Sequence, residues 1–477
     1  MTKQPPLHGE TRLEHDFLGD KLIPATVYWG VHTARAVENF PISGQVVGGM
    51  PDLVRALAFV KKAAAQTNEA LGVLEPSVAL AIVKACDDLL EGQLHHQFVV
   101  DVIQGGAGTS TNMNANEVIA NRALEHLDLP KGRYDVVHPN DHVNASQSTN
   151  DVYPTALRLA AWMGIDGLLD AMADLRGAFE RKAEEFKSVL KIGRTQLQDA
   201  VPMTLGQEFL TFAIMIGEDE ARLREARTLV AEVNLGATAI GTGINAPAGY
   251  AAMVVPLLAR LSGVPLTRAA NLIEATQDTG AFMQLSGVLK RVACKLSKTC
   301  NDLRLLSSGP QAGFGEIRLP ARQAGSSIMP GKVNPVIPEV MNQVAFEVVG
   351  NDMTITMASE AGQLQLNAFE PIMGWALHKS VAHLTRACRT LQHHCIEGIE
   401  ANHELLARRV AESVTLVTAL NPLIGYERSA LIAKTALASG GTIADVAESL
   451  GIMTRAEMQA LLVPERLTQP LPAAMRS

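Results

Sequence analysis

The chain has 477 residues, of which 47% are hydrophobic, 19% charged and 4% aromatic. This composition supplies a large apolar core and excludes a disordered chain. The 41 Lys and Arg against 49 Asp and Glu leave a net charge of −8, which argues against a nucleic-acid partner. The scarcity of aromatic residues favours helices over a β-sandwich.

The cysteines and the polar N-terminal segment indicate the cellular compartment of the protein. There are five cysteines with no CxxC pair, so neither a disulfide framework nor a zinc ribbon is expected. Residues 1–20 show no secretory signal. The longest uncharged stretch, 233–259, is interrupted by glycine and proline, so no membrane span is expected. We therefore expect a cytoplasmic protein that has no membrane contact.

The elements at the N-terminal end are short. Frequent glycine and proline in the first fifty residues predict loops with short strands. Two helices are expected to follow, at 51–74 and at 76–96.

The middle of the chain predicts long helices. Apolar residues recur at steps of three and four from Leu157 to Phe179, and the spacing returns at 205–216 and 285–303. Helices with such narrow apolar seams pack as a bundle, and long seams often continue between subunits. The pattern indicates an oligomer, with a large monomeric helical domain as the alternative. After about residue 404, glycine and proline divide the chain into short helices.

Four segments of small, hydroxyl or amide residues are expected to lie just before helix N-termini. Free backbone N–H groups and the helix dipole bind anions there, although ordinary N-capping explains any one such segment alone. Taken together, and with Lys332 in the last, they predict a pocket for a small anion. The segments are 105–112 (before a helix near Asn114), 144–151, 193–196 (before a helix near Pro202) and 325–335.

Two motifs resemble nucleotide sites without meeting their requirements. Segment 325–335 lacks the Walker A spacing, and Val333 stands where Ser or Thr should follow Lys332. The GxGxxA run at 241–246 lacks a preceding strand. Neither motif therefore predicts a nucleotide site. No HExxH motif is present, so no metal site is expected either.

The run GSSIMPGKVNP at 325–335 resembles the signature loop of the aspartase/fumarase superfamily. The resemblance extends over nearly the whole chain, through segments 28–33, 106–110, 146–151 and 194–200. It implies a mainly α fold with a homotetrameric twenty-helix core, in which three subunits contribute to each active site. The three implied domains are an N-terminal mixed domain at 1–146, a long central helical bundle domain at 147–403 and a small C-terminal helical domain at 404–477.

The resemblance is closest to the aspartases. It implies reversible deamination of L-aspartate to fumarate and ammonia, with removal of a Cβ proton through an aci-carboxylate intermediate. The alternative is a class II fumarase, but many fumarases carry a His where Gln196 stands, paired with a Glu that matches Glu339. A second alternative is a non-catalytic structural protein, as among lens proteins of the superfamily. The retained Ser326 and Lys332 argue against it.

The same resemblance assigns roles to individual residues. Ser326 is expected to be the general base, in a loop that Gly325 and Gly331 allow to close, and backbone N–H groups and Lys332 would stabilise its alkoxide. Glu339 has a supporting role, and no cofactor is expected. The expected substrate-binding residues are Thr109, Ser148, Thr149, Thr195 and Gln196 for the β-carboxylate, Asn150 for the amino group, and Lys332 and Asn334 for the α-carboxylate.

Overall fold

A computed structural model describes residues 9–469 of the chain. The chain divides into two compact units. Unit 1 comprises the residues up to Leu169, Ala221–Arg291 and Phe346–Leu384, and unit 2 comprises Asp170–Glu220, Val292–Ala345 and the residues from Thr385 onward. This division differs from the three domains implied by the resemblance, whose boundaries remain a prediction.

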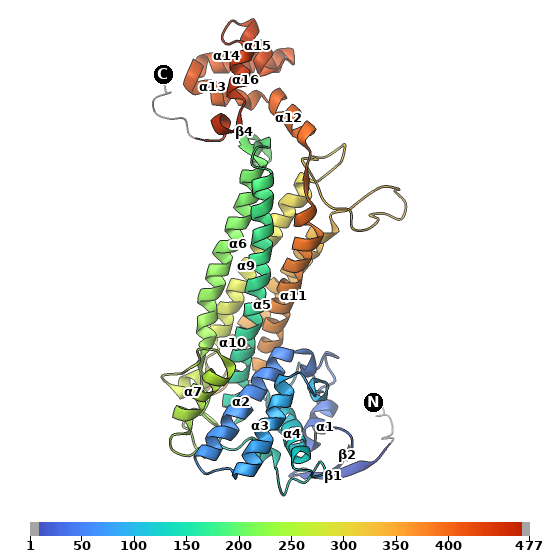
Figure 1. Ribbon diagram of the computed structural model, residues 1–477, viewed down its shortest axis with the longest axis vertical. Helices are drawn as coiled ribbons and strands as arrows, with labels where there is room; N and C mark the ends of the chain where they lie inside the picture. Colours follow the sequence, from blue (N-terminus) through green and yellow to red (C-terminus); the bar gives the residue numbers. More distant parts are fainter. Residues whose placement is uncertain (1–8, 470–477) are drawn as a thin grey trace. The chain divides into compact units, whose positions relative to one another are not determined.

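The described chain is mainly helical, as the composition predicts (Figure 1). The strands are β1 (Thr11–Asp16), β2 (Gly19–Pro24), β3 (Leu190–Thr195), β4 (Gln198–Thr204), β5 (Glu232–Val233), β6 (Thr267–Arg268), β7 (Ile317–Arg318) and β8 (Glu400–Ala401). They form two-stranded pairs in chain order, of which only β5–β6 is parallel.

The helices fall into three groups along the chain. The first group is α1 (Val31–Asn39), α2 (Pro51–Ala70), α3 (Pro76–Leu90) and α4 (Thr109–His126). The long helices α5 (Thr149–Glu185), α6 (Leu205–Arg227), α9 (Gly280–Leu306), α10 (Val336–Glu360) and α11 (Glu370–His394) follow, with α7 (Tyr250–Ser262) and α8 (Leu272–Gln277) between them. The last are α12 (His403–Glu412), α13 (Val417–Ile424), α14 (Tyr426–Ser439), α15 (Ile443–Ser449), α16 (Arg455–Leu461) and α17 (Pro464–Leu467).

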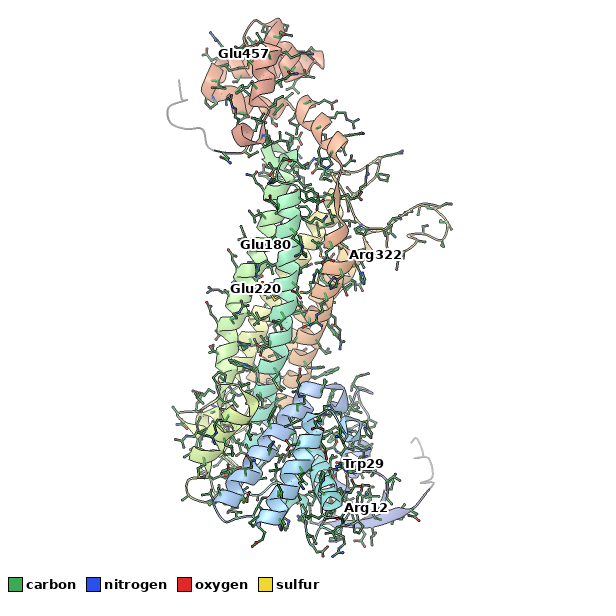
Figure 2. The ribbon with its side chains drawn as sticks, in the orientation of Figure 1. Arg12, Trp29, Glu180, Glu220, Arg322 and Glu457 are labelled. Carbon is green, nitrogen blue, oxygen red and sulfur yellow. The ribbon has the colours of Figure 1, made fainter. Side chains whose placement is uncertain are left out.

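Helix α1, which the sequence did not predict, begins on a buried carboxylate. Glu117 accepts backbone hydrogen bonds from Gly30 at 2.7 Å and His32 at 2.8 Å, which satisfies N–H groups at the helix start. A Cβ on Gly30 would lie 2.3 Å from Glu14 Oε2, so only glycine fits there. The Arg12 guanidinium donates to the Trp29 carbonyl at 2.7 Å, and Figure 2 labels both residues. This explains the segment 28–33 that carries part of the family resemblance.

The predicted long helices are confirmed. The apolar residues that define the seams at 157–179, 205–216 and 285–303 are buried almost without exception. Within unit 2, Phe179 of α5 packs against Phe209 and Phe212 of α6, with ring centroids 6.1 and 5.6 Å apart. The two helices predicted at 51–74 and 76–96 are also present as α2 and α3, each ending a few residues earlier.

The short C-terminal helices have an apolar core of their own, as the division of the sequence after residue 404 suggests. Leu420, Ile432, Ile443 and Met458 are among its buried members. Over the described residues no helix has the length and apolar character that crossing a membrane requires. All five cysteines are free thiols, and only Cys294 is exposed.

Candidate active site

The first expected site segment leads directly into α4. The helix begins at Thr109, five residues earlier than expected, and Thr109 is exposed at its N-terminal end. Gly108 has φ 87°, and a Cβ there would lie 2.4 Å from the Tyr153 ring. The glycine therefore allows the turn to lie against an aromatic ring while the Thr109 hydroxyl stands at the positive end of the helix dipole, which favours binding of an anion.

The second segment starts α5 and is fastened by a buried carboxylate. Asp151 accepts from the Ser148 N–H at 2.9 Å, and its other oxygen accepts from Gly236 at 2.9 Å and Thr238 at 3.0 Å. Asn150 Nδ2 donates to the Ala239 carbonyl at 2.8 Å. Two loops of unit 1 are thereby held together around the start of α5.

The hydrogen bonds of Thr149 and Asn150 leave complementary groups for a ligand. Thr149 Oγ1 accepts from Asn112 Nδ2 at 3.1 Å, so its hydroxyl hydrogen can donate to a carboxylate. Because Asn150 uses an amide hydrogen on Ala239, its carbonyl oxygen can accept from an ammonium group. The pair therefore suits a ligand that carries both charges.

A buried lysine that the sequence interpretation missed lies beneath this segment. Lys61 Nζ donates to Asn144 Oδ1 at 2.9 Å and to Gln147 Oε1 at 3.0 Å. Burial lowers the pKa of Lys61 to about 7, and burial raises the pKa of Asp151 to about 6. Each charge partly offsets the cost of burying the other, so a polar network forms the floor of the segment. A sequence signal was available, because Lys61 follows Val54 and Leu57 at the core positions of α2.

The signature loop belongs to the irregular segment between β7 and α10 in unit 2. Gly325 N–H donates to the Lys332 carbonyl at 2.8 Å, and Asn334 Nδ2 donates to the Gly325 carbonyl at 2.7 Å. These bonds close the neck of the loop. A Cβ on Gly325 would lie 2.6 Å from the Lys332 oxygen, and Gly331 has φ 80°, so the loop requires both glycines.

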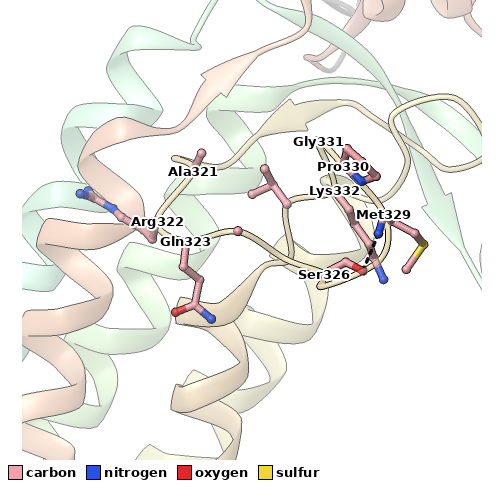
Figure 3. Close-up of a pocket in the computed structure, with 10 residues that line it drawn as sticks. Ala321, Arg322, Gln323, Ser326, Met329, Pro330, Gly331 and Lys332 are labelled. Carbon is pink, nitrogen blue, oxygen red and sulfur yellow. Dashed lines mark hydrogen bonds between the residues drawn. The ribbon is translucent and has the colours of Figure 1, made fainter.

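The Ser326 hydroxyl lies among backbone donors, as shown in Figure 3. Its Oγ accepts from the N–H of Met329 at 3.0 Å, the bond drawn in Figure 3, and from the N–H of Ile328 at 3.2 Å. Ser326 does not cap the following helix, because α10 begins only at Val336. Two N–H groups aimed at one oxygen stabilise negative charge on it.

Ser326 and Lys332 line the same pocket, which has a volume of about 430 Å³. Lys332 is exposed, and so are the neighbouring apolar side chains of Ile328 and Met329. Glu339 lies in the first turn of α10, where a carboxylate interacts favourably with the helix dipole. The pocket thus combines a stabilised hydroxyl with a cationic group, which suits an anionic ligand.

The helix expected near Pro202 is present as α6, which begins at Leu205, but the segment before it is not the expected loop. Residues 190–204 form a β-hairpin instead, with Thr195 paired to Gln198 and Gln196 in the two-residue turn. Gln196 and Leu197 both have left-handed backbones, with φ 53° and 62°. Thr195 and Gln196 are therefore exposed at a hairpin tip and do not lie before a helix N-terminus.

The expected residues form two sets, one in each compact unit. Thr109, Ser148, Thr149 and Asn150 belong to unit 1, and the members in unit 2 are Thr195, Gln196, Ser326, Lys332, Asn334 and Glu339. The described residues contain no group of three or more His, Cys, Asp or Glu side chains placed to hold a metal ion.

Two family models match the chain. A model described as lyase matches residues 19–350, and one described as the fumarase C C-terminus matches residues 416–469. The chain therefore belongs to the lyase family of the aspartase/fumarase superfamily, as its signature loop indicates.

Curated proteins similar to this chain indicate its group within the family more specifically. Aspartate ammonia-lyase of Pseudomonas aeruginosa is 57% identical over 97% of this chain and 98% of the relative. The enzyme of the same name from Escherichia coli strain K12 is 52% identical over 98% of both chains. These matches identify the chain as a carbon–nitrogen lyase of the aspartate ammonia-lyase group.

Solved structures agree on the fold. A fumarate lyase:delta crystallin from Brucella melitensis, bound to cobalt, has a TM-score of 0.94 and 57% identity, covering 97% of this chain and 100% of that one. A recombinant class II fumarase from Schistosoma mansoni has a TM-score of 0.91 with 34% identity and the same coverage of both chains.

Proposed function

We propose that this chain catalyses the reversible deamination of L-aspartate to fumarate and ammonia. The observation that carries the proposal is the identity above 50%, over almost the whole chain, to several enzymes named aspartate ammonia-lyase. Hydration of fumarate is the second candidate, and the 34% identity to a class II fumarase favours it less.

The reaction begins with removal of a proton from Cβ of aspartate. That proton is weakly acidic because the adjacent carboxylate is already charged, and its removal places a second negative charge on that group. Catalysis therefore needs a strong, positioned base and donors for the aci-carboxylate. Ser326 supplies the base, since the N–H groups of Ile328 and Met329 favour its alkoxide and Lys332 adds positive charge to the same pocket.

The remaining residues hold the substrate on either side of the reacting carbon. The hydroxyls of Thr109, Ser148, Thr149 and Thr195, with the Gln196 amide, bind the β-carboxylate as it takes up charge. Asn150 accepts from the ammonium group through the amide oxygen that its bond to Ala239 leaves available. Lys332 attracts the α-carboxylate, and Asn334 keeps Lys332 in place by closing the neck of the loop.

We further propose that the enzyme acts as a homotetramer in which different subunits supply the two sets of residues. An apolar stripe on α10 supports assembly, because Phe346, Met353 and Met357 are 67%, 61% and 65% exposed. Their spacing places them on one face of the helix, and contiguous exposed apolar surface marks an interface. A cytoplasmic location is consistent with five free thiols.

The test is a side-by-side assay of fumarate formation from L-aspartate and L-malate with the purified full chain. We expect fumarate and an equal amount of ammonia from L-aspartate, and at most a minor rate from L-malate. Faster turnover of L-malate would establish the hydratase instead. An absence of fumarate from both substrates would refute the catalytic assignment.

A further inference from the structure

The tip of the β3–β4 hairpin has an unfavourable backbone. A two-residue hairpin turn with positive φ at both positions normally contains Asn-Gly or a similar pair, whereas this one contains Gln196 and Leu197. Left-handed conformations are costly for such side chains and persist when the surrounding structure imposes them. Thr195, Gln196 and Leu197 are exposed, so the constraint has to come from the base of the hairpin.

The base of the hairpin is held by one buried carboxylate. The side chain of Glu316, which is 1% exposed, forms ion pairs with Arg194 Nη1 at 2.6 Å and Lys191 Nζ at 2.8 Å. Arg409 of α12 approaches the same carboxylate at 3.4 Å. Two of the three cations are in β3, and Arg194 directly precedes Thr195.

Additional contacts fix the orientation of each cation. The Arg194 guanidinium lies 4.2 Å from the centroid of the Phe314 ring, which restricts its plane. Lys191 is 2% exposed and also pairs with Glu208 of α6 at 2.6 Å. The Asn402 N–H donates to the Glu316 carbonyl at 2.9 Å. Glu316 is thus rigidly placed, and it determines where the side chains of β3 lie.

We propose that Glu316 is a positioning residue, which holds the hairpin so that Thr195 and Gln196 face the substrate carboxylate. This inference rests on the proposed function, since it assigns the hairpin tip to substrate binding. A buried ion network adds little net stability, because desolvation offsets the attraction between its charges. Its short ion pairs fix the position of β3 relative to Glu316, and small errors in geometry at a reacting centre reduce rates strongly.

The test is Glu316→Gln in the full-length enzyme, which keeps the side-chain shape and removes the charge. We expect kcat/KM for L-aspartate to fall by about tenfold or more at a temperature where circular dichroism and sedimentation match the parent enzyme. The affinity for succinate, a dicarboxylate that cannot react, should fall as well. Parent-like kcat/KM would overturn the inference. Should the Gln variant not fold, Arg194→Lys provides the same measurement, since it keeps the charge and loses the planar fork.

A double variant with Thr195→Ala separates positioning from general destabilisation. If Glu316 acts through the hairpin tip, adding Glu316→Gln to the Thr195→Ala variant should lower kcat/KM by less than about a further twofold, because the effects of coupled residues are not additive. If the double variant instead loses the product of the two single losses in kcat/KM, Glu316 has a merely structural role.

The matched control is Asp88→Asn, which removes a largely buried carboxylate that pairs with Arg122 at 2.6 Å and His126 at 2.8 Å in unit 1. It should lower thermal stability while leaving kcat/KM within about twofold of the parent value. A loss of kcat/KM in this control equal to that of Glu316→Gln would also count against positioning. Failure of the proposed function is distinguishable, because the parent enzyme itself would then release no ammonia from L-aspartate.

Discussion

At the scale of single residues, Ser326 is the base that we propose for the reaction. A serine hydroxyl is a weak base in water, but two backbone N–H groups at 3.0 and 3.2 Å lower the cost of charging its oxygen. We expect Ser326→Ala to reduce kcat by about a hundredfold or more while the subunit assembly is retained. Fumarate absorbance and sedimentation velocity measure the two properties.

The neighbouring residue provides the control for this prediction. Ser327 is exposed in the same loop, so Ser327→Ala introduces the same chemical change beside the pocket. It should keep most of the activity. Equal losses in both variants, or near-normal turnover of Ser326→Ala, would contradict the assignment of the base.

The residues of the candidate site were predictable to different degrees. The segments that contain Thr109, Ser326 and Lys332 were recognised from their composition, and the family resemblance then assigned a role to each residue. Lys61 was missed because its role depends on Asn144 and Gln147, which lie more than eighty residues away in the sequence. Local composition carries no information about such contacts, whereas a lysine at a core position of an amphipathic helix does suggest that a partner exists.

At the scale of elements, the neck of the signature loop is its most constrained point. A Cβ on Gly325 would lie 2.6 Å from the Lys332 carbonyl oxygen and 2.9 Å from the Asn334 nitrogen, and backbone atoms cannot give way easily. Gly325→Ala should therefore open the neck, displace Lys332 and lower kcat/KM by about tenfold or more, with little change in thermal stability.

Steady-state kinetics and calorimetry test the Gly325 prediction. Gly49→Ala is the control, because a Cβ at that exposed position meets nothing within 4 Å. Parent-like kinetics for Gly325→Ala would mean that the closed neck is irrelevant to catalysis.

Helix α11 starts with a buried carboxyl group. Glu370 is 3% exposed, and its Oε2 has no hydrogen-bond partner among the described residues. Burial raises the pKa of Glu370 from 4.5 to about 8, although Arg158 opposes the shift. The folded protein thus keeps a proton that the unfolded chain releases, and its stability falls as pH rises from about 4.5 to 8.

Glu370→Gln removes this titration. Its free energy of unfolding, relative to that of the parent enzyme, should rise by roughly 2 kcal/mol between pH 6 and pH 9. Denaturant unfolding at one fixed protein concentration measures the difference, since assembly also contributes to stability. A difference that stays constant with pH would show that Glu370 is ionised throughout the range.

Helices with an apolar pattern over several turns were predicted well. Elements whose conformation depends on tertiary contacts were predicted poorly. The seams of α5, α6 and α9 extend over several turns, and their pattern alone identifies the helices. Helix α1 and the hairpin at 190–204 were missed. The helix depends on Glu117 and the hairpin on Glu316, and neither carboxylate is close in the sequence. Short elements contribute too little periodicity to be identified without such partners.

At the scale of the whole molecule, the assembly that we propose uses the apolar stripe of α10 formed by Phe346, Met353 and Met357. Phe346 is 67% exposed at its start, and an added carboxylate there would have to be buried on association. Phe346→Glu should therefore yield smaller species in sedimentation experiments and abolish activity, because the two sets of residues would no longer meet. Leu437→Glu on α14, where the parent side chain is 71% exposed, should leave size and activity unchanged. An unaltered sedimentation coefficient for Phe346→Glu would exclude this face of α10 as a subunit interface.

The distribution of thiols has a practical consequence. Cys86, Cys300, Cys388 and Cys395 are buried, and burial raises the pKa of each thiol, so these sulfurs present almost no reactive thiolate. Cys294 on α9 is the exposed one. A maleimide fluorophore would accordingly attach at one known position of each subunit, without prior removal of any cysteine. The fluorescence of that label would report changes in the environment of α9 during turnover.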